Sequence, residues 1–157
     1  MPLSTEQEVR TFEIVKEETI AASIEIVFET ILEQMGPLNE NPDGTPMPMK
    51  LEAWPGGRWY RDLGKNAGHF WGHVQAIRPP TLLEICGPLF MSFPVISNVQ
   101  YRLTEEAGGT RLTLTHQAMG LFLPEHLEGF PKGWGETVDA IKAGAEAKQA
   151  KPDKRKS

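Results

Sequence analysis

The hydrophobic positions of this chain follow two periods, and the longer of the two predicts its helices. Over residues 24–35, apolar side chains recur every three or four positions, as on one face of an amphipathic helix. Ser23 precedes this stretch, and its hydroxyl can accept a hydrogen bond from an unpaired amide of the first turn. Gly36 and Pro37 follow it, as a left-handed C-terminal residue and a proline that cannot continue the helix. We therefore expect a helix over residues 24–35.

A second stripe of the same spacing lies near the C-terminus. Apolar side chains recur from Leu127 to Ala145 at intervals of three or four. Pro131 and the nearby glycines weaken the start of the pattern, because proline removes a backbone donor and glycine disfavours a helix. The firm part of this long helix is therefore expected to begin near Lys132.

The shorter period, an alternation of apolar and polar residues, predicts β-strands. Turn-forming Pro-Gly, Asn-Ala-Gly and Gly-Gly sequences separate the alternating segments and are typical of hairpins. Within residues 69–77, Phe70 and Val74 are expected on one face of a strand, and His69 and His73 on the other. We expect strands over residues 11–20, 49–54, 58–63, 69–77, 82–85, 99–104 and 110–116.

The order of these elements predicts an α+β fold with one covered sheet face. The strands over residues 99–104 and 110–116 alternate cleanly, which is typical of an antiparallel sheet with one wet and one dry face. The long C-terminal helix is the only candidate to cover the dry face. We therefore expect a curved antiparallel sheet of six or seven strands wrapped around that helix, an arrangement that tends to leave a cavity.

The composition fits one globular domain with a charged end. The chain has 157 residues, of which 39% are hydrophobic and 24% charged, and we place a single domain at residues 1–147. Residues 148–157 carry a charge of +4 and are expected to form a disordered basic tail. Since the whole chain carries −5, residues 1–147 carry −9, and this acidic body disfavours binding to nucleic acid.

The sequence also bears on compartment and assembly. No segment is long and apolar enough to span a membrane, and the N-terminus lacks the basic-then-apolar pattern of a signal peptide. A single cysteine, Cys86, excludes a disulfide within the chain. We expect a cytoplasmic protein, either a monomer or a homodimer.

Several short motifs resemble one known family when their order and spacing are taken together. They are Ile24-Glu25-Ile26-Val27-Phe28, Trp54-Pro55-Gly56-Gly57-Arg58-Trp59, Gly72-His73-Val74, Pro79-Pro80-Thr81-Leu82-Leu83, Gly108-Gly109-Thr110-Arg111-Leu112, Thr115-His116 and Gly133-Trp134. Over about residues 11–148, the chain resembles the activator of heat-shock-protein-90 ATPase homologue-like branch of the START-like (SRPBCC) superfamily. The resemblance implies the helix-grip fold, and it raises the hypothesis of association with a chaperone. The chain departs from many relatives at Cys86-Gly87-Pro88, where they have an aromatic residue.

The residues that could carry metal or covalent chemistry lack the context that such chemistry requires. His69 and His73 lie four residues apart on a strand, which separates them by about 13 Å, too far to share one metal ion. No sequence feature places a cationic group or a helix N-terminus beside Cys86 to activate its thiol. We therefore predict no catalytic residue, no metal and no cofactor.

Three residues could contribute either to packing or to a ligand site. His116 lies on the same predicted face as Leu114, so it needs a buried polar partner, which could be a protein group or a ligand headgroup. The hydroxyl of Tyr101, on the preceding strand, is a natural second polar group there. Trp134 either anchors the last helix on the sheet or lines a pocket beneath that helix.

These residues lead to a function hypothesis of non-enzymatic binding. We expect a hydrophobic or amphipathic small molecule to occupy a cavity between the sheet and the C-terminal helix. A chaperone-associated interaction module and a polyketide cyclase-like enzyme are the alternatives. The candidate pocket residues are Trp59, Phe70, Val74, Ile85, Phe90, Tyr101, Leu114, His116, Trp134 and Val138.

Overall fold

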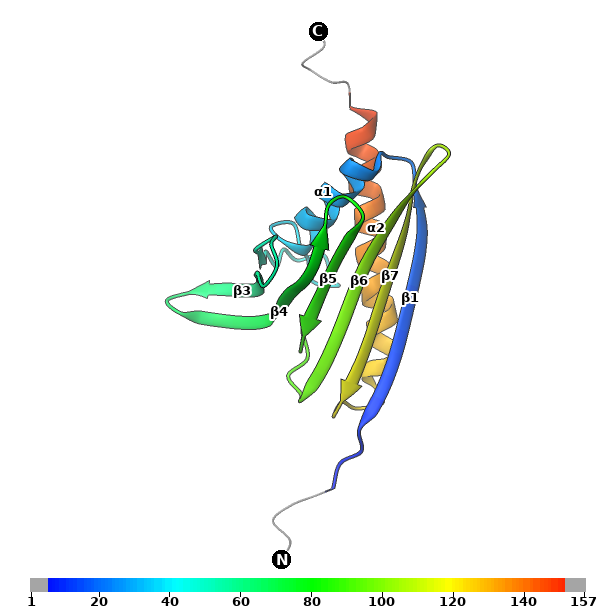
Figure 1. Ribbon diagram of the computed structural model, residues 1–157. Coiled ribbons are helices and arrows are strands. Elements are labelled where there is room, and N and C mark those ends of the chain that lie inside the picture. The colour runs from blue at the N-terminus through cyan, green and yellow to red at the C-terminus, as the bar shows by residue number, and fades with distance from the viewer. Residues whose placement is uncertain (1–5, 152–157) are drawn as a thin grey trace, which may run out of the picture.

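The computed structural model describes residues 6–151, apart from the side chain of His126. A strand and a helix come first, six further strands follow, and a long helix ends the fold (Figure 1). The helices are α1 (Ile24–Met35) and α2 (His126–Ala150). The strands are β1 (Arg10–Ile20), β2 (Lys50–Leu51), β3 (Arg58–Gly64), β4 (Ala67–Arg78), β5 (Leu82–Gly87), β6 (Val95–Glu106) and β7 (Gly109–Gly120).

The strands form one antiparallel sheet in the order β1-β7-β6-β5-β4-β3-β2. Figure 1 shows the long strands curving along α2, while the hairpin of β3 and β4 extends away from the helices. The α+β helix-grip fold predicted from the sequence is confirmed, with seven strands in the sheet. No helix in the described part of the chain is long and apolar enough to cross a membrane.

Helix α1 begins and ends where its pattern predicts, although Gly36, the residue that follows it, takes another conformation than predicted. The Ser23 hydroxyl accepts a hydrogen bond from the Ile26 amide at 3.3 Å, as a cap should. Gly36 has a φ of −110°, so the prediction of a left-handed residue there is wrong. A Cβ at Gly36 would lie 2.9 Å from the Leu32 carbonyl oxygen, which gives glycine a steric reason at this position.

Helix α2 begins at His126, about two turns before the predicted start near Lys132. Pro131 lies inside the helix, and the amides of Leu127 and Glu128 donate to the carbonyls of Pro124 and Glu125. The missing amide of Pro131 leaves only one carbonyl without its helical donor, so the helix continues through it. The weakness expected from local propensity is overcome by packing, since Phe130 and Trp134 are buried against the sheet.

The C-terminal end of α2 extends past the predicted domain boundary at residue 147. Lys148 lies within the helix and pairs with Glu33 of α1, and it is 3.7 Å from Glu29. Residues 152–157, the remainder of the predicted basic tail, lie outside the described residues.

A bulge between β3 and β4 changes the faces predicted for this hairpin. Trp59 lies opposite Gly72 and Tyr60 lies opposite Phe70, so Trp71 is the extra residue. The prediction that Phe70 faces the interior is wrong: it is 45% exposed, and its ring lies 4.8 Å from that of His73. Trp71 turns inward in its place, with its ring 4.9 Å from that of Trp59.

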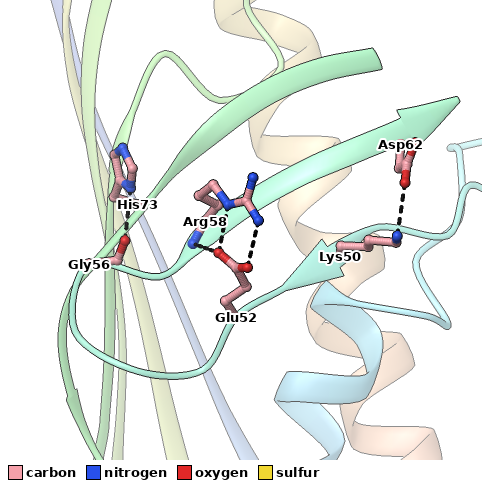
Figure 2. A network of polar contacts seen from close by, with 6 residues as sticks. All are labelled: Lys50, Glu52, Gly56, Arg58, Asp62 and His73. Carbon is pink, nitrogen blue, oxygen red and sulfur yellow. Dashed lines mark hydrogen bonds and ion pairs between the residues drawn. The ribbon is translucent and has the colours of Figure 1, made fainter. Parts of the chain in front are cut away.

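Polar contacts on the outer side of the hairpin hold β2 and β3 together (Figure 2). Glu52 accepts hydrogen bonds at 2.8 Å from the backbone amide and the guanidinium of Arg58. These bonds hold the pKa of Glu52 at about 2, well below its ordinary value. Lys50 and Asp62 pair at 2.8 Å farther along the hairpin. Because Arg58 immediately precedes Trp59, this network fixes the start of β3 and helps to orient that indole inward.

The turns before and after β3 follow simple backbone rules, but the second one is centred earlier in the chain than predicted. Gly56 has a φ of 83° and the Gly57 amide donates to the Trp54 carbonyl, as in a type II turn. The next turn was predicted at residues 66–68. Its two central residues are Lys65 and Asn66, both with positive φ, and Asn66 suits that conformation.

Candidate functional site

A cavity of about 470 Å³ lies between the C-terminal end of α1, the loop at residues 36–49 and the N-terminal half of α2. A volume of this size is within the range of small-molecule sites. The lining residues are Gln34, Met35, Asn39, Glu40, Asn41, Pro42, Gly44, Met47, Trp59, Trp71, Phe90, Gly129, Phe130, Gly133, Trp134, Glu136, Thr137 and Ala140.

Five aromatic side chains from four parts of the chain form a continuous wall of this cavity. The rings of Trp59 and Trp71 lie 4.9 Å apart, and Phe90 lies 5.7 Å from Trp71. Phe90 is also 5.2 Å from Phe130 and 6.4 Å from Trp134. These separations are typical of interacting aromatic pairs, so the wall is a connected, mostly apolar surface.

The end of α1 fixes one side of this wall. The indole Nε1 of Trp59 donates to the Met35 carbonyl at 2.7 Å, and Trp59 is almost fully buried. Carbonyls in the last turn of a helix have no helical donor, so the indole satisfies one of them. The same bond ties the bulged hairpin to α1.

The loop between β5 and β6 supplies Phe90. Leu89 and Met91 on either side of it are buried, and the Leu89 amide donates to the Trp71 carbonyl at 2.7 Å. Leu89 has a φ of 57°, which directs the chain so that Phe90 is left 39% exposed beside the cavity. The apolar loop is therefore anchored by its neighbours while its central phenyl group lines the cavity.

A buried network of hydrogen bonds fixes Trp134 on the side away from the cavity. Its Nε1 donates to Nδ1 of His116 at 2.8 Å, so that nitrogen carries no proton. The protonated Nε2 of the neutral His116 then donates to the Ser97 hydroxyl at 3.0 Å. Burial lowers the pKa of His116 to about 4, so the ring is neutral at physiological pH.

Tyr101 takes a similar supporting place. Its hydroxyl donates to the sulfur of Met35 at 3.1 Å, and burial raises the pKa of the phenol above its ordinary value. Tyr101 and His116 therefore both lie one layer behind the cavity, in contact with Met35 and Trp134, which line it. The polar groups predicted to face a ligand are satisfied by protein atoms.

The structure divides the ten candidate pocket residues into three groups. Trp59, Phe90 and Trp134 line the cavity, whereas Phe70 is on the outside of the hairpin. The remaining candidates belong to the buried core and do not line the cavity: Val74, Ile85, Tyr101, Leu114, His116 and Val138.

Sequence reasoning missed several lining residues. Alternation along β4 places Trp71 on the outer face of the sheet, and the bulge turns it to the inner face. The residues of the loop at 36–49 follow no periodic pattern that would mark them as lining a cavity. Phe130 carried a usable signal, because it precedes Trp134 by four positions on the predicted helical stripe.

Polar residues gather at the rim of the cavity. The loop contributes Asn39, Glu40 and Asn41, and the Asn39 amide group donates to the Met47 carbonyl at 3.1 Å, which stabilises the loop. Helix α2 contributes Glu136 and Thr137. Glu40 and Glu136 are the titratable lining residues among the side chains that the structure describes.

Two glycines of α2 leave space on the helical side of the cavity. Gly129 and Gly133 both line it, and a Cβ at either position would have no heavy atom within 4 Å. Glycine inside a helix costs about 0.5–1 kcal/mol relative to alanine. These glycines therefore enlarge the cavity at a cost in helix stability, and neither is required by crowding or by a positive φ.

Nothing among the described residues supports a metal or thiol site. No group of three His, Cys, Asp or Glu side chains in residues 6–151 could hold a metal ion. His73 is exposed, and its Nδ1 lies 3.1 Å from the Gly56 carbonyl oxygen, whereas His69 lies opposite Arg61 (Figure 2 shows His73). Cys86 is a free, half-buried thiol on β5.

A protein-family model described as activator of Hsp90 ATPase homolog 1-like protein matches residues 21–146. A comparison with curated proteins finds no match. Among solved structures, an uncharacterised protein from Rhizobium leguminosarum is similar at a TM-score of 0.72 and 18% identity, over 91% of this chain and 99% of that chain.

Two further solved structures are similar at the level of the fold. A protein from Aeromonas hydrophila described as AHSA1-like has a TM-score of 0.64 and 21% identity, over 90% of this chain and 97% of its own. CalU16 from Micromonospora echinospora has a TM-score of 0.60 and 22% identity, over 90% of this chain and 86% of its own. At these identities the similarity shows a shared fold.

Proposed function

Because the chain belongs to the family described as activator of Hsp90 ATPase homolog 1-like protein, and its aromatic cavity is the best-formed site described above, we propose that it binds a small, largely apolar molecule there. The binding involves no chemical conversion of the ligand. We expect it to take place in the cytoplasm.

The aromatic wall is the observation that carries this proposal. A core that only packed itself would bring such large side chains into full contact, yet about 470 Å³ remains open beside Trp59, Trp71, Phe90, Phe130 and Trp134. Apolar pockets with a few polar groups at the rim are typical of small-molecule sites. A bound aromatic or alicyclic body would remove this apolar surface from water.

The glycines of α2 support the same proposal. Gly129 and Gly133 lie one turn apart on the cavity side of the helix, where alanine would be tolerated sterically and would favour the helix. Their presence keeps the space above the aromatic wall open, which a binding function requires and a packed core does not.

A titration with the neutral fluorescent probe N-phenyl-1-naphthylamine tests the proposal. We expect saturable binding to the wild-type protein with one site, accompanied by the rise in probe fluorescence that an apolar environment produces. The substitution Gly133→Leu places a side chain in the open space and should weaken binding at least about tenfold.

Gly135→Leu is the matched control. Gly135 lies on the same helix but does not line the cavity, and a Cβ there would meet only the flexible end of Lys16 at 4.0 Å. We expect its affinity for the probe to equal that of the wild type. A wild-type protein that does not bind the probe, or equal affinities for the two variants, would refute binding in this cavity.

The family description and one surface feature favour a second candidate, contact with a chaperone of the Hsp90 type. Ile96 and Met119 are cross-strand neighbours on β6 and β7, and they are 68% and 50% exposed. Stimulation of an Hsp90 ATPase by this protein, lost on Ile96→Glu, would support that function. An unchanged ATPase rate at saturating protein would exclude it.

The cyclase hypothesis has no such support. It rests on His116 and Tyr101 acting within a pocket, and neither residue lines the cavity. Both groups are buried and bonded to protein atoms, so neither can reach a substrate held against the aromatic wall.

A further inference from the structure

We propose that the cavity selects organic cations, specifically aromatic ammonium compounds with a body of two or three rings. This inference rests on the proposed binding function and adds the charge of the ligand to it. Three features of the cavity support it: the carboxylates at the rim, the absence of basic side chains among the described lining residues, and the indole-rich wall.

The two carboxylates come from different walls of the cavity. Glu40 belongs to the loop at residues 36–49 and Glu136 to α2, and both line the cavity. Two walls of the cavity therefore each carry a negative charge that could attract an ammonium group. The acidic body of the protein, −9 over residues 1–147, adds an attractive long-range field for cations.

Nine of the twenty acidic residues between residues 6 and 151 form ion pairs with basic side chains. Glu52, Glu17 and Glu33 each pair with a basic side chain. Among the described residues, no ion pair joins Glu40 or Glu136 to a lysine, arginine or histidine. Their charge is available to a ligand.

No basic side chain lines the cavity within the part of the chain whose side chains are described. His116 lies behind Trp134 and accepts a hydrogen bond through Nδ1, so it is neutral. A carboxylate ligand such as a fatty acid would therefore face Glu40 and Glu136 without a counterion.

The wall itself favours cations over neutral molecules of equal size. The negative face of an indole attracts an ammonium group, and tryptophan is the strongest of the aromatic residues in this respect. Trp59, Trp71 and Trp134 all border the cavity. A two- or three-ring body can pack against this wall with its ammonium group between the indoles and the carboxylates of the rim.

Three probes with the same naphthalene body separate charge from shape. They are (1-naphthylmethyl)trimethylammonium, 1-naphthylmethanol and 1-naphthylacetate, each titrated calorimetrically into the wild-type protein at low salt. We expect the ammonium compound to bind about tenfold more tightly than the alcohol, and the carboxylate to bind more weakly than either. Raising the salt concentration should reduce the differences in affinity between the ammonium compound, the alcohol and the carboxylate, and should leave the affinity for the alcohol unchanged.

Single neutral substitutions locate the source of the preference. Glu136→Gln and Glu40→Gln should each lower the affinity for the ammonium compound about threefold and leave the affinity for the alcohol unchanged. Glu105→Gln is the control, because it removes the same charge from an exposed residue of β6 that does not line the cavity. It should change neither affinity.

The outcomes distinguish this inference from the function on which it rests. Equal binding of all three probes, or a preference for the carboxylate, overturns cation selection and leaves the binding function intact. Binding of none of the probes overturns both. A preference for the ammonium compound that survives Glu136→Gln together with Glu40→Gln would contradict the assigned role of the rim.

Discussion

At the scale of single residues, the site depends on the support of Trp134. This side chain is 5% exposed, lines the cavity with its ring, and donates its indole proton to His116 at 2.8 Å. The sequence indicated that Trp134 either anchors the helix or lines a pocket, and the structure shows that it does both. The partner of His116 could not be predicted from the sequence, because Trp134 lies 18 residues away, on a helix that packs against the strand of His116.

Truncation of Trp134 should therefore be costly. We expect Trp134→Ala to lower the free energy of unfolding by about 3–5 kcal/mol, since it removes a large buried side chain. Trp134→Phe should cost less, about 1–3 kcal/mol, mainly because Nδ1 of His116 loses its donor. Urea unfolding of the three proteins measures both values. A loss below about 1 kcal/mol for Trp134→Ala would contradict the anchoring role.

The buried His116 predicts a pH dependence of stability. Its pKa is about 4 in the folded protein and 6.5 in the unfolded chain. Above pH 6.5 the imidazole of His116 is neutral in both the folded and the unfolded protein, so its contribution to the free energy of unfolding is fully present. As the pH falls from 6.5 to 4 only the unfolded chain takes up the proton, so the free energy of unfolding decreases by about 3 kcal/mol.

Denaturant melts from pH 7.5 to pH 4 on the wild type and His116→Gln isolate this contribution from that of the carboxylates. Glutamine can still accept a bond from Trp134 but does not titrate, so the variant should lose less stability over this range. Parallel curves for the two proteins would show that the histidine is not protected from protonation in the folded state.

At the scale of elements, α2 combines packing and an open cavity on one helix. Its buried positions follow the predicted stripe, while Gly129 and Gly133 leave room on the neighbouring face. The periodicity predicted the existence of the helix and its buried side. It misplaced the start by about two turns, because local propensity penalised Pro131 and the glycines while burial of Phe130 and Trp134 compensates for them.

Gly133→Ala should stabilise the protein by about 0.5–1 kcal/mol, because the new methyl group meets no heavy atom within 4 Å and favours the helix. Thermal melts compared with Gly135→Ala, which changes the same helix away from the cavity, measure the effect. Destabilisation by Gly133→Ala alone would mean that the space beside Gly133 is closed in the folded protein.

The bulged hairpin shows why alternation alone misplaced part of the site. One extra residue in β4 sends Trp71 inward and Phe70 outward, and nothing in the composition of the strand marks where that residue falls. From this bulge to a second register shift between Val74 and Ala76 the alternation holds, and Val74 is buried as predicted. The error is therefore local, yet it removes one predicted pocket residue and conceals a real lining residue.

At the scale of the whole molecule, the fold followed from the order and periods of the segments, whereas the position of the cavity did not. Sheet and helix together predict a covered face, and the structure has one. The cavity opens beside it, where α1, the loop at residues 36–49 and α2 meet. That meeting point depends on contacts between distant segments, such as the bond from Trp59 to the Met35 carbonyl, which no local pattern encodes.

The distribution of tryptophans provides the most direct test of binding in this cavity. Trp59, Trp71 and Trp134 line it, whereas Trp54 is 58% exposed and does not. The four indole N–H signals can be assigned by substitution of each tryptophan with phenylalanine and followed by nuclear magnetic resonance during titration with N-phenyl-1-naphthylamine. Binding in the cavity predicts saturable shifts of the Trp59, Trp71 and Trp134 signals and an unmoved Trp54 signal. Shifts confined to Trp54, or no shift of any indole signal at saturating probe, would contradict it.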